Sequence, residues 1–298
     1  MLSLQRRGFI RKGLQLASLP LIYPLAHAEK FFVERNNLKL SLNAYSFNAA
    51  LSEGTLQLEK LFDYCAKEGF AAVDLTAYYI PEYPEVPSDG QLYGIKKMAH
   101  HRGLHISGTG VRNDFTLSDP KLLKQEIDLV KNWVVAAAKL GAPVVRVFAG
   151  PRLKAGESWE EKVEFVIRAC KECASFAAGY GVIVALQNHN EFVQSAAQVD
   201  YIMERVDEDW FGLVLDIGSY SQHDPYEEIS KNIRHAVNWQ LKENVNHFGT
   251  QKPVDLKRLI ALIRESNYQG YLPIETLGPG DPFEKVSGFL ARVQEAMG

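Results

Sequence analysis

The chain has 298 residues, of which 46% are hydrophobic and 23% are charged, and its formal net charge at pH 7 is -3. These values are those of an ordinary globular protein with one large domain or two small ones, and they exclude intrinsic disorder and a fibrous repeat. Outside the N-terminal segment, no apolar run reaches the length of about 18 residues that a membrane-spanning helix requires.

Residues 1–28 have the features of an export signal. A basic cluster at 6–12 precedes an apolar stretch at 14–25, and Ala26-His27-Ala28 provides small residues at a cleavage position. The paired arginines that open the cluster resemble a twin-arginine signal. We therefore predict a signal peptide over 1–28, export by the twin-arginine machinery to the periplasm, and a single mature domain over 29–298. The alternative is an amphipathic N-terminal helix.

Removal of this segment makes the chain more acidic. The segment holds four basic and no acidic residues, so the remainder has 29 basic and 36 acidic side chains and a net charge of about -7. An acidic protein repels polyanions such as DNA. We therefore predict that no nucleic acid is a partner.

The three cysteines do not form a disulfide framework, even in an oxidising compartment. Cys170 and Cys173 have the CxxC spacing, but they lie within an apolar pattern of helical period, and the chain has no second pair of ligands. We interpret both as buried helix residues.

From residue 38 onward, short β-rich runs alternate with amphipathic helices. Apolar residues at helical spacing predict helices over 123–137 and 163–177. Asp119-Pro120 and Asp281-Pro282 each place an N-cap residue before a proline, and Ser158 with Glu161 fits a capping box. Glycines at 69, 103, 141 and 181 stand where helices should end. The predicted strands are 39–45, 71–77, 104–109, 144–149, 182–187, 212–216, 236–241 and 271–275.

Eight strand and helix units of roughly 34 residues each favour a (βα)8 TIM barrel, an α/β fold, over an open doubly wound sheet. The glycine-rich phosphate-binding fingerprints of the open folds are missing, so we predict no nucleotide cofactor. No linker or change of composition divides the chain, which indicates one domain. In such a barrel the chemistry lies at the carboxyl ends of the strands.

Polar side chains gather at these strand ends. Alternation with period two puts Gln187 with His189, and Gln240 with Lys242, on the same side of their strands. Asp216 and Glu275 end apolar runs, where a carboxylate needs a partner or a function. The candidate site residues are Asn43, Tyr45, Thr76, Thr109, Arg112, Arg146, Gln187, His189, Asp216, Gln240, Lys242 and Glu275.

Four short motifs lie in order on four successive predicted strands: LQNH at 186–189, LDIG at 215–218, NWQLKE at 238–243 and LPIE at 272–275. In these motifs the chain, from about residue 38 to its end, resembles the sugar phosphate isomerase/epimerase family, the xylose isomerase-like TIM barrels. The resemblance implies one divalent metal held by Glu, Asp, His and Glu. It also implies that the two Glu residues move protons at the substrate carbons.

This sequence matches the implied metal site at Asp216 and Glu275 and departs from it at two positions. Gln187 stands in place of Glu, and Gln240 stands in place of His. The set Gln187, Asp216, Gln240 and Glu275 therefore implies an all-oxygen site that suits Mg²⁺, Mn²⁺ or Ca²⁺ better than Zn²⁺ and binds weakly. Gln187 cannot act as a base, so the resemblance implies that Glu275 is the main proton-transfer group, with His189 or Lys242 assisting.

Some of these residues have a second interpretation. His189 is either a proton-transfer group or an ordinary histidine at the barrel rim. Lys242 either stabilises an enolate-like charge or pairs with Glu243 or Asp216. Arg146 either contacts a polar substrate or forms a structural ion pair.

The remaining candidates are predicted to bind the substrate. Tyr78, Tyr79 and Trp239 either stack on a sugar ring or only pack in the core. These substrate-binding candidates are Tyr45, Thr109, Arg112 and Trp239.

Three functions are compatible with these residues. The first is an exported enzyme that isomerises, epimerises or eliminates by proton transfer next to a carbonyl of a carbohydrate. Phosphorylated sugars are cytoplasmic, so export favours a free sugar, a keto-sugar or a glycoside. The second is a carbohydrate-binding barrel with a degenerate metal site. The third is a DNA-repair endonuclease of the same superfamily, which the acidic charge and the scarcity of histidine ligands disfavour.

Overall fold

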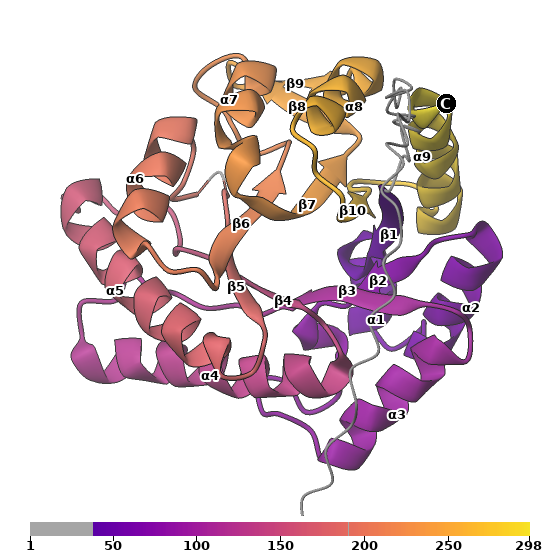
Figure 1. The fold of residues 1–298 in the computed structure, drawn as a ribbon, viewed down its shortest axis with the longest axis horizontal. Helices are drawn as coiled ribbons and strands as arrows, with labels where there is room; N and C mark the ends of the chain where they lie inside the picture. The colour runs from indigo at the N-terminus through magenta and orange to yellow at the C-terminus, as the bar shows by residue number, and fades with distance from the viewer. Residues whose placement is uncertain (1–37, 190) are drawn as a thin grey trace, which may run out of the picture. The chain divides into compact units, whose positions relative to one another are not determined.

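The computed structural model describes residues 38–189 and 191–298, and these form a closed barrel of parallel strands. The strands follow the order β1-β10-β7-β6-β5-β4-β3-β2 around the ring (Figure 1). This confirms the predicted (βα)8 TIM barrel. The barrel strands are β1 Lys39–Asn43, β2 Ala72–Asp74, β3 His105–Gly110, β4 Val144–Val147, β5 Ile183–Gln187, β6 Phe211–Asp216, β7 Ala236–Lys242 and β10 Tyr271–Glu275.

Each barrel strand is followed by an α-helix on the outside of the ring (Figure 1). A short extra helix, α1, follows β1, and an antiparallel hairpin of β8 (Asn244–His247) and β9 (Thr250–Pro253) comes between β7 and α8. Within the described residues the helices are α1 Asn48–Ser52, α2 Leu58–Glu68, α3 Asp89–His100, α4 Pro120–Leu140, α5 Trp159–Ala178, α6 Ala196–Val206, α7 Pro225–Asn232, α8 Leu256–Glu265 and α9 Pro282–Met297.

The helix boundaries follow the predicted capping signals. The side chain of Asp119 accepts hydrogen bonds from the first turn of α4, and Asp281 does the same for α9. Helix α4 ends at Gly141, which has φ 78°, a left-handed conformation that suits glycine. These signals therefore set where helices begin and end between the strands. All barrel strands pair in parallel, so their carboxyl ends lie on the same side of the ring.

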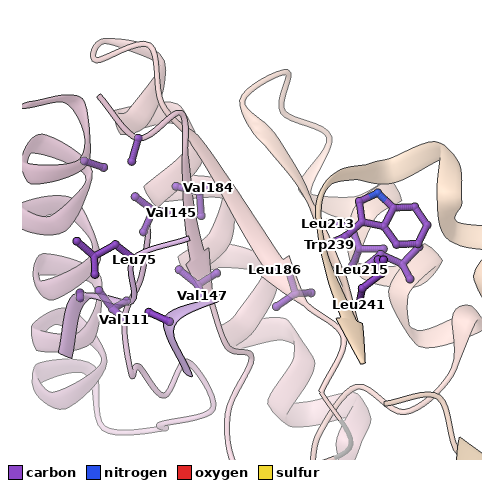
Figure 2. Packing of buried hydrophobic residues seen from close by; sticks show 14 of the residues in the cluster. Leu75, Val111, Val145, Val147, Val184, Leu186, Leu213, Leu215, Trp239 and Leu241 are labelled. Atoms are coloured by element: carbon purple, nitrogen blue, oxygen red, sulfur yellow. The ribbon is translucent and has the colours of Figure 1, made fainter. Parts of the chain in front are cut away.

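Period-two alternation along the strands separates the core from the site. Leu213 and Leu215 of β6 and Trp239 and Leu241 of β7 lie on the outer face, among the buried hydrophobic residues drawn in Figure 2. The opposite face carries Val214, which packs in a small cluster of buried residues with Val144 and Ala185. Cys170 and Cys173 are buried in α5, as predicted, and Cys65 is buried in α2.

Three features differ from the predicted elements. Strand β4 ends at Val147, two residues before its predicted end. Strands β1 and β2 also end earlier, because the chain turns into short 3-10 helices at Ala44–Phe47 and Ala77–Tyr79. The hairpin of β8 and β9 was not predicted. Its strands are polar and largely exposed, so they carry no hydrophobic alternation.

The predicted signal peptide at 1–28 lies outside the described residues. Among the residues that the structure describes, no helix is both long and apolar enough to span a membrane.

Candidate active site

The carboxyl ends of the eight barrel strands surround a cavity of about 630 Å³. Its volume lies within the range of small-molecule sites, roughly 300–1,000 Å³. Most of the predicted site residues line it: Asn43, Tyr45, Thr76, Arg112, Arg146, Gln187, His189, Gln240, Lys242 and Glu275.

Asp216, at the end of β6, is the most heavily hydrogen-bonded carboxylate of the site. Its Oδ2 atom accepts hydrogen bonds from Gln187 Nε2 at 2.8 Å and from Ser219 Oγ at 2.8 Å. The same oxygen accepts a third bond from Lys242 Nζ at 2.7 Å, and Oδ1 accepts one from the backbone N–H of Gly218 at 2.9 Å. The side chain is fully buried, so these four donors take the place of water.

Asn188 fixes the backbone of Asp216. Its Nδ2 donates to the Asp216 carbonyl at 2.9 Å, and its Oδ1 accepts from the Asp216 N–H at 2.8 Å. This pair of bonds joins the ends of β5 and β6. The conformation of the Asp216 side chain is therefore held from both its backbone and its carboxylate.

Lys242 bridges two buried carboxylates. Its Nζ lies 2.7 Å from Asp216 Oδ2 and 3.3 Å from Glu275 Oε1. The sequence left open a pair with Glu243, but Glu243 pairs with Lys285 at 3.3 Å instead. The predicted Asp216 pair is therefore present, and Glu275 completes it.

Burial and the neighbouring charges shift the pKa values of Lys242, Asp216 and Glu275. Burial acts to lower the pKa of Lys242, but Asp216 and Glu275 outweigh burial and hold that pKa above its usual value. Burial acts to raise the pKa of Asp216, but the Lys242 ammonium outweighs it, and the pKa lies below its usual value. Burial dominates at Glu275 and raises its pKa. Glu275 is therefore the carboxylate of the pair that takes up a proton more readily.

His189 follows Gln187 by two residues and lines the cavity, and its ring makes an edge contact with Phe148 at 5.1 Å between centroids. Its Nδ1 atom is buried and has no hydrogen-bond partner among the described residues; the Glu191 carboxylate is 3.8 Å away. Burial lowers the pKa of His189, which keeps the ring neutral. A neutral imidazole that lines the cavity has one ring nitrogen that is able to accept a proton.

Arg146 is a buried arginine without a carboxylate partner in the described part of the chain. Its Nη1 donates to the Val111 carbonyl and its Nη2 to the Tyr78 hydroxyl, each at 2.7 Å, and the guanidinium stacks on Phe148 at 4.0 Å. Gly110 leaves room for it, because a Cβ there would lie 2.8 Å from Arg146 Nε. The structure thus shows no structural ion pair for Arg146, and its positive charge faces the cavity.

Several residues that line the cavity are missing from the sequence prediction, and Asp74 is the one that ends a barrel strand. It ends β2, lines the cavity and accepts a hydrogen bond from Asn238 Nδ2 at 2.7 Å. Burial raises the pKa of Asp74 to about 6. The signal that identified Asp216, a carboxylate at the end of an apolar run, was also present here. The predicted strand 71–77 runs three residues past Asp74, so Asp74 did not stand at its end.

Two predicted substrate contacts do not reach the cavity. Trp239 is fully buried and packs against Tyr268, with 5.8 Å between ring centroids. It stands between Asn238 and Gln240, whose side chains point inward, so alternation turns it toward the helices. Thr109 is also buried, and its hydroxyl has no partner among the described residues. Both residues belong to the packing of the barrel wall. At the rim, Arg112 does line the cavity.

The four predicted metal ligands converge, but their donor chemistry does not fit a bound cation. Asp216 already accepts four hydrogen bonds, about as many as a carboxylate has lone-pair sites. Gln187 turns its NH₂ group, and not its oxygen, toward Asp216 and toward Gln240 Oε1 at 2.6 Å. The described residues include no group of three or more His, Cys, Asp or Glu side chains that could hold a metal ion. The expected divalent metal is not tested by these observations and stays a prediction, which this arrangement of donors disfavours.

Residues 62–293 match the family model of the xylose isomerase-like TIM barrels. The chain belongs to this family. Its barrel resembles D-psicose 3-epimerase from Clostridium cellulolyticum H10, with a TM-score of 0.73 and 14% identity over 87% of this chain and 99% of the other. The 3-keto-D-glucoside 4-epimerase of E. coli has a TM-score of 0.69 and 14% identity over the same shares.

L-ribulose 3-epimerase is a further neighbour of this xylose isomerase-like barrel, with a TM-score of 0.72 and 15% identity over 87% of this chain and 94% of the other. At such identities these likenesses show a shared fold. No curated protein matches the chain by sequence.

Proposed function

We propose that this protein is an exported enzyme that moves a proton next to a carbonyl of a non-phosphorylated sugar, keto-sugar or glycoside. The outcome of that transfer is an isomerisation, an epimerisation or an elimination. The observation that carries the proposal is Glu275, a buried carboxylate with a raised pKa that lines a polar cavity beside the fixed ammonium of Lys242. The names of the structural neighbours, which include two sugar epimerases and a keto-glucoside epimerase, agree with it.

In this proposal Glu275 removes a proton from the carbon next to the carbonyl, and the electron pair of the broken C–H bond moves onto the carbonyl oxygen. A positive charge placed in advance stabilises the enolate-like oxygen that results. Lys242 has three N–H donors, of which two meet carboxylates, so one is available for that oxygen. Protonated Glu275 then returns the proton to carbon, or His189 assists from its own position in the cavity.

Arg146, Arg112 and Tyr45 are proposed to bind the sugar. The buried Arg146 guanidinium has no carboxylate partner in the described chain, so its remaining N–H groups favour a substrate rich in oxygen atoms. Arg112 stacks on Tyr78 at 4.5 Å at the rim of the cavity. These groups surround the substrate on the side of β1 to β4, opposite Lys242.

Incubation with a panel of free sugars, keto-sugars and glycosides in D₂O tests the function. Proton transfer at carbon should place solvent deuterium next to the carbonyl of the substrate, and the exchange should be visible by NMR before net turnover is measured. The panel is run with and without added Mg²⁺, Mn²⁺ or Ca²⁺, because the expected divalent metal belongs to the same test. Exchange that is no faster than without protein, on every sugar, would contradict the proposal.

The second candidate is a carbohydrate-binding barrel that lacks chemistry. The amide pair of Gln187 and Gln240, joined at 2.6 Å where the resemblance implies a base and a ligand, favours this alternative. Binding of a sugar, measured by calorimetry, without any deuterium exchange would support it. An endonuclease function is disfavoured by the acidic mature chain and by the absence of a histidine-rich cluster within the described residues.

A further inference from the structure

A lysine ammonium occupies the centre of the cluster in which the sequence predicted a metal ion. Lys242 Nζ lies between Asp216 Oδ2 and Glu275 Oε1, at 2.7 and 3.3 Å. We propose that Lys242 is the resident cation of this barrel and takes the place of a divalent metal, so that the site is complete without one. The role of Lys242 in catalysis rests on the proposed function. The expectation that the site binds no divalent metal tightly depends on the site alone.

The hydrogen bonds of Asp216 favour an ammonium over a metal ion. Ser219, Gln187 and Lys242 donate to Oδ2, and the Gly218 N–H donates to Oδ1. An ammonium fits such a network because it is itself a donor. A metal ion on Oδ2 would need a lone pair that these three donors already use. A metal bound about 2.2 Å from Oδ2 would also lie within about 5 Å of Nζ, where two cations repel each other.

The two glutamines agree with the smaller charge of an ammonium. A divalent ion is best held by several anionic ligands, and this site keeps two carboxylates and replaces the other two ligands by amides. Gln187 donates from Nε2 to both Asp216 and Gln240, so it extends the hydrogen-bond network of the carboxylate and turns its amide nitrogen, not its oxygen, toward Asp216. One ammonium between two carboxylates, with neutral amides beside them, leaves a single net negative charge.

The chain also makes room for the lysine stem. Gly218 follows Asp216 by two residues, and a Cβ at that position would lie 2.9 Å from Lys242 Cδ. A larger residue at 218 would therefore displace the stem. Lys242 itself stands opposite Glu275 in the register of β7 and β10, while Gln240 stands opposite Asp216 in that of β6 and β7. Two strand pairs thus carry the ammonium and both carboxylates to one point.

Metal binding by the purified mature protein tests the inference without any need for a substrate. The protein is stripped with EDTA and titrated with Mn²⁺, and free Mn²⁺ is measured by electron paramagnetic resonance. We expect binding to the unmodified protein weaker than about 1 mM, the weak end of protein sites for hard cations. Lys242→Met removes the ammonium, keeps a stem of similar size and should tighten Mn²⁺ binding at least tenfold.

Lys131→Met is the matched control, because Lys131 pairs with Glu172 at 2.7 Å on the helices outside the barrel. It should leave Mn²⁺ binding unchanged. Adding Asp216→Asn to Lys242→Met should abolish the gained affinity. Mn²⁺ should also raise the melting temperature of Lys242→Met and leave that of the unmodified protein unchanged, because a ligand stabilises only the state that binds it.

Two results would overturn the inference. The first is one Mn²⁺ bound by the unmodified protein at micromolar concentration and lost in Asp216→Asn, a result that does not require Lys242→Met to fold. The second is a folded Lys242→Met that gains no affinity for Mn²⁺. If the protein turns over no sugar but its variants show the expected Mn²⁺ affinities, the result counts against the proposed function and still supports Lys242 as the resident cation.

Discussion

Glu275 combines burial, a raised pKa and a neighbouring ammonium in one carboxylate. If it takes the proton from carbon, Glu275→Gln should preserve the shape of the site and lower turnover by about 10² or more, a typical loss for a general base. Glu265→Gln, at the exposed end of α8, is the control and should keep full activity. Steady-state kinetics on the substrate found in the panel gives the measurement. Near-normal turnover of Glu275→Gln would rule out this role.

Asp74 should make the protein less stable as pH rises. Its pKa is raised from an ordinary value of 3.8 to about 6 by burial, so the folded state binds this proton more tightly than the unfolded state does. The stability that this group contributes is present below pH 3.8 and is lost as pH rises to about 6. Because Asn keeps the acceptor for Asn238, Asp74→Asn should stabilise the protein at pH 8 by up to about 3 kcal/mol and have little effect near pH 4.

Urea unfolding of Asp74→Asn and of the unmodified protein at several pH values between 4 and 8 measures this difference. A constant gap across that range would show that Asp74 is not the titrating group.

Gln187 and Gln240 are the two residues that separate this site from the ligand set implied by the resemblance. Gln187→Glu with Gln240→His adds a negative charge and an imidazole, so the double variant should bind Mn²⁺ at least tenfold more tightly than the unmodified protein. The gain should be larger when Lys242→Met is added. Calorimetric titration gives the affinities, and no change in either background would show that these positions do not face a cation.

At the scale of elements, strand β3 makes room for the neighbouring strand's arginine. Gly110 has no left-handed φ, so its backbone accepts alanine, but a Cβ would lie 2.8 Å from Arg146 Nε. Gly110→Ala should therefore displace the guanidinium and raise KM for the sugar about tenfold, with a smaller effect on kcat, as expected for lost substrate binding. Gly94→Ala on α3, where a Cβ meets nothing within 4 Å, is the control and should keep the KM. An unchanged KM in Gly110→Ala would show that Arg146 does not contribute to binding of the substrate.

The barrel strands were predictable because each is a short β-rich run between helix signals of a different period. The hairpin of β8 and β9 was not, since Val245 is the one buried residue of its polar strands and its turn, Phe248-Gly249, is an uncommon turn sequence. Alternation placed Gln240 and Lys242 on one face correctly. The same rule, applied to the residue between Gln240 and Asn238, places Trp239 on the other face.

The sequence predicted which strand ends carry site residues. It did not predict which of these side chains contact one another. Which carboxylate Lys242 would meet depends on the closeness of β6, β7 and β10 in space, and a sequence read along one strand does not contain that distance. The same holds for Arg146, whose lack of a carboxylate partner in the described chain became visible only when all eight strand ends were in place.

At the scale of the whole molecule, export is the expectation that restricts the substrate class. The paired arginines, the apolar stretch and the Ala-x-Ala site occur in the order that a twin-arginine signal requires. Replacing Arg6 and Arg7 by Lys should block export and leave the precursor inside the cell. Fractionation of cells and N-terminal sequencing of the mature protein, with cleavage expected after Ala28, provide the measurement. Unchanged export in a strain without the twin-arginine machinery would refute this expectation.

The ammonium between Asp216 and Glu275 is covalently part of the chain, which gives it a different relation to the environment from that of a bound ion. Chelators, dilution and scarcity of trace elements cannot remove it, and no loading step has to precede activity. A catalyst of this kind would work at the same rate in a habitat starved of manganese as in one rich in it. Its activity would then be limited by the supply of sugar alone.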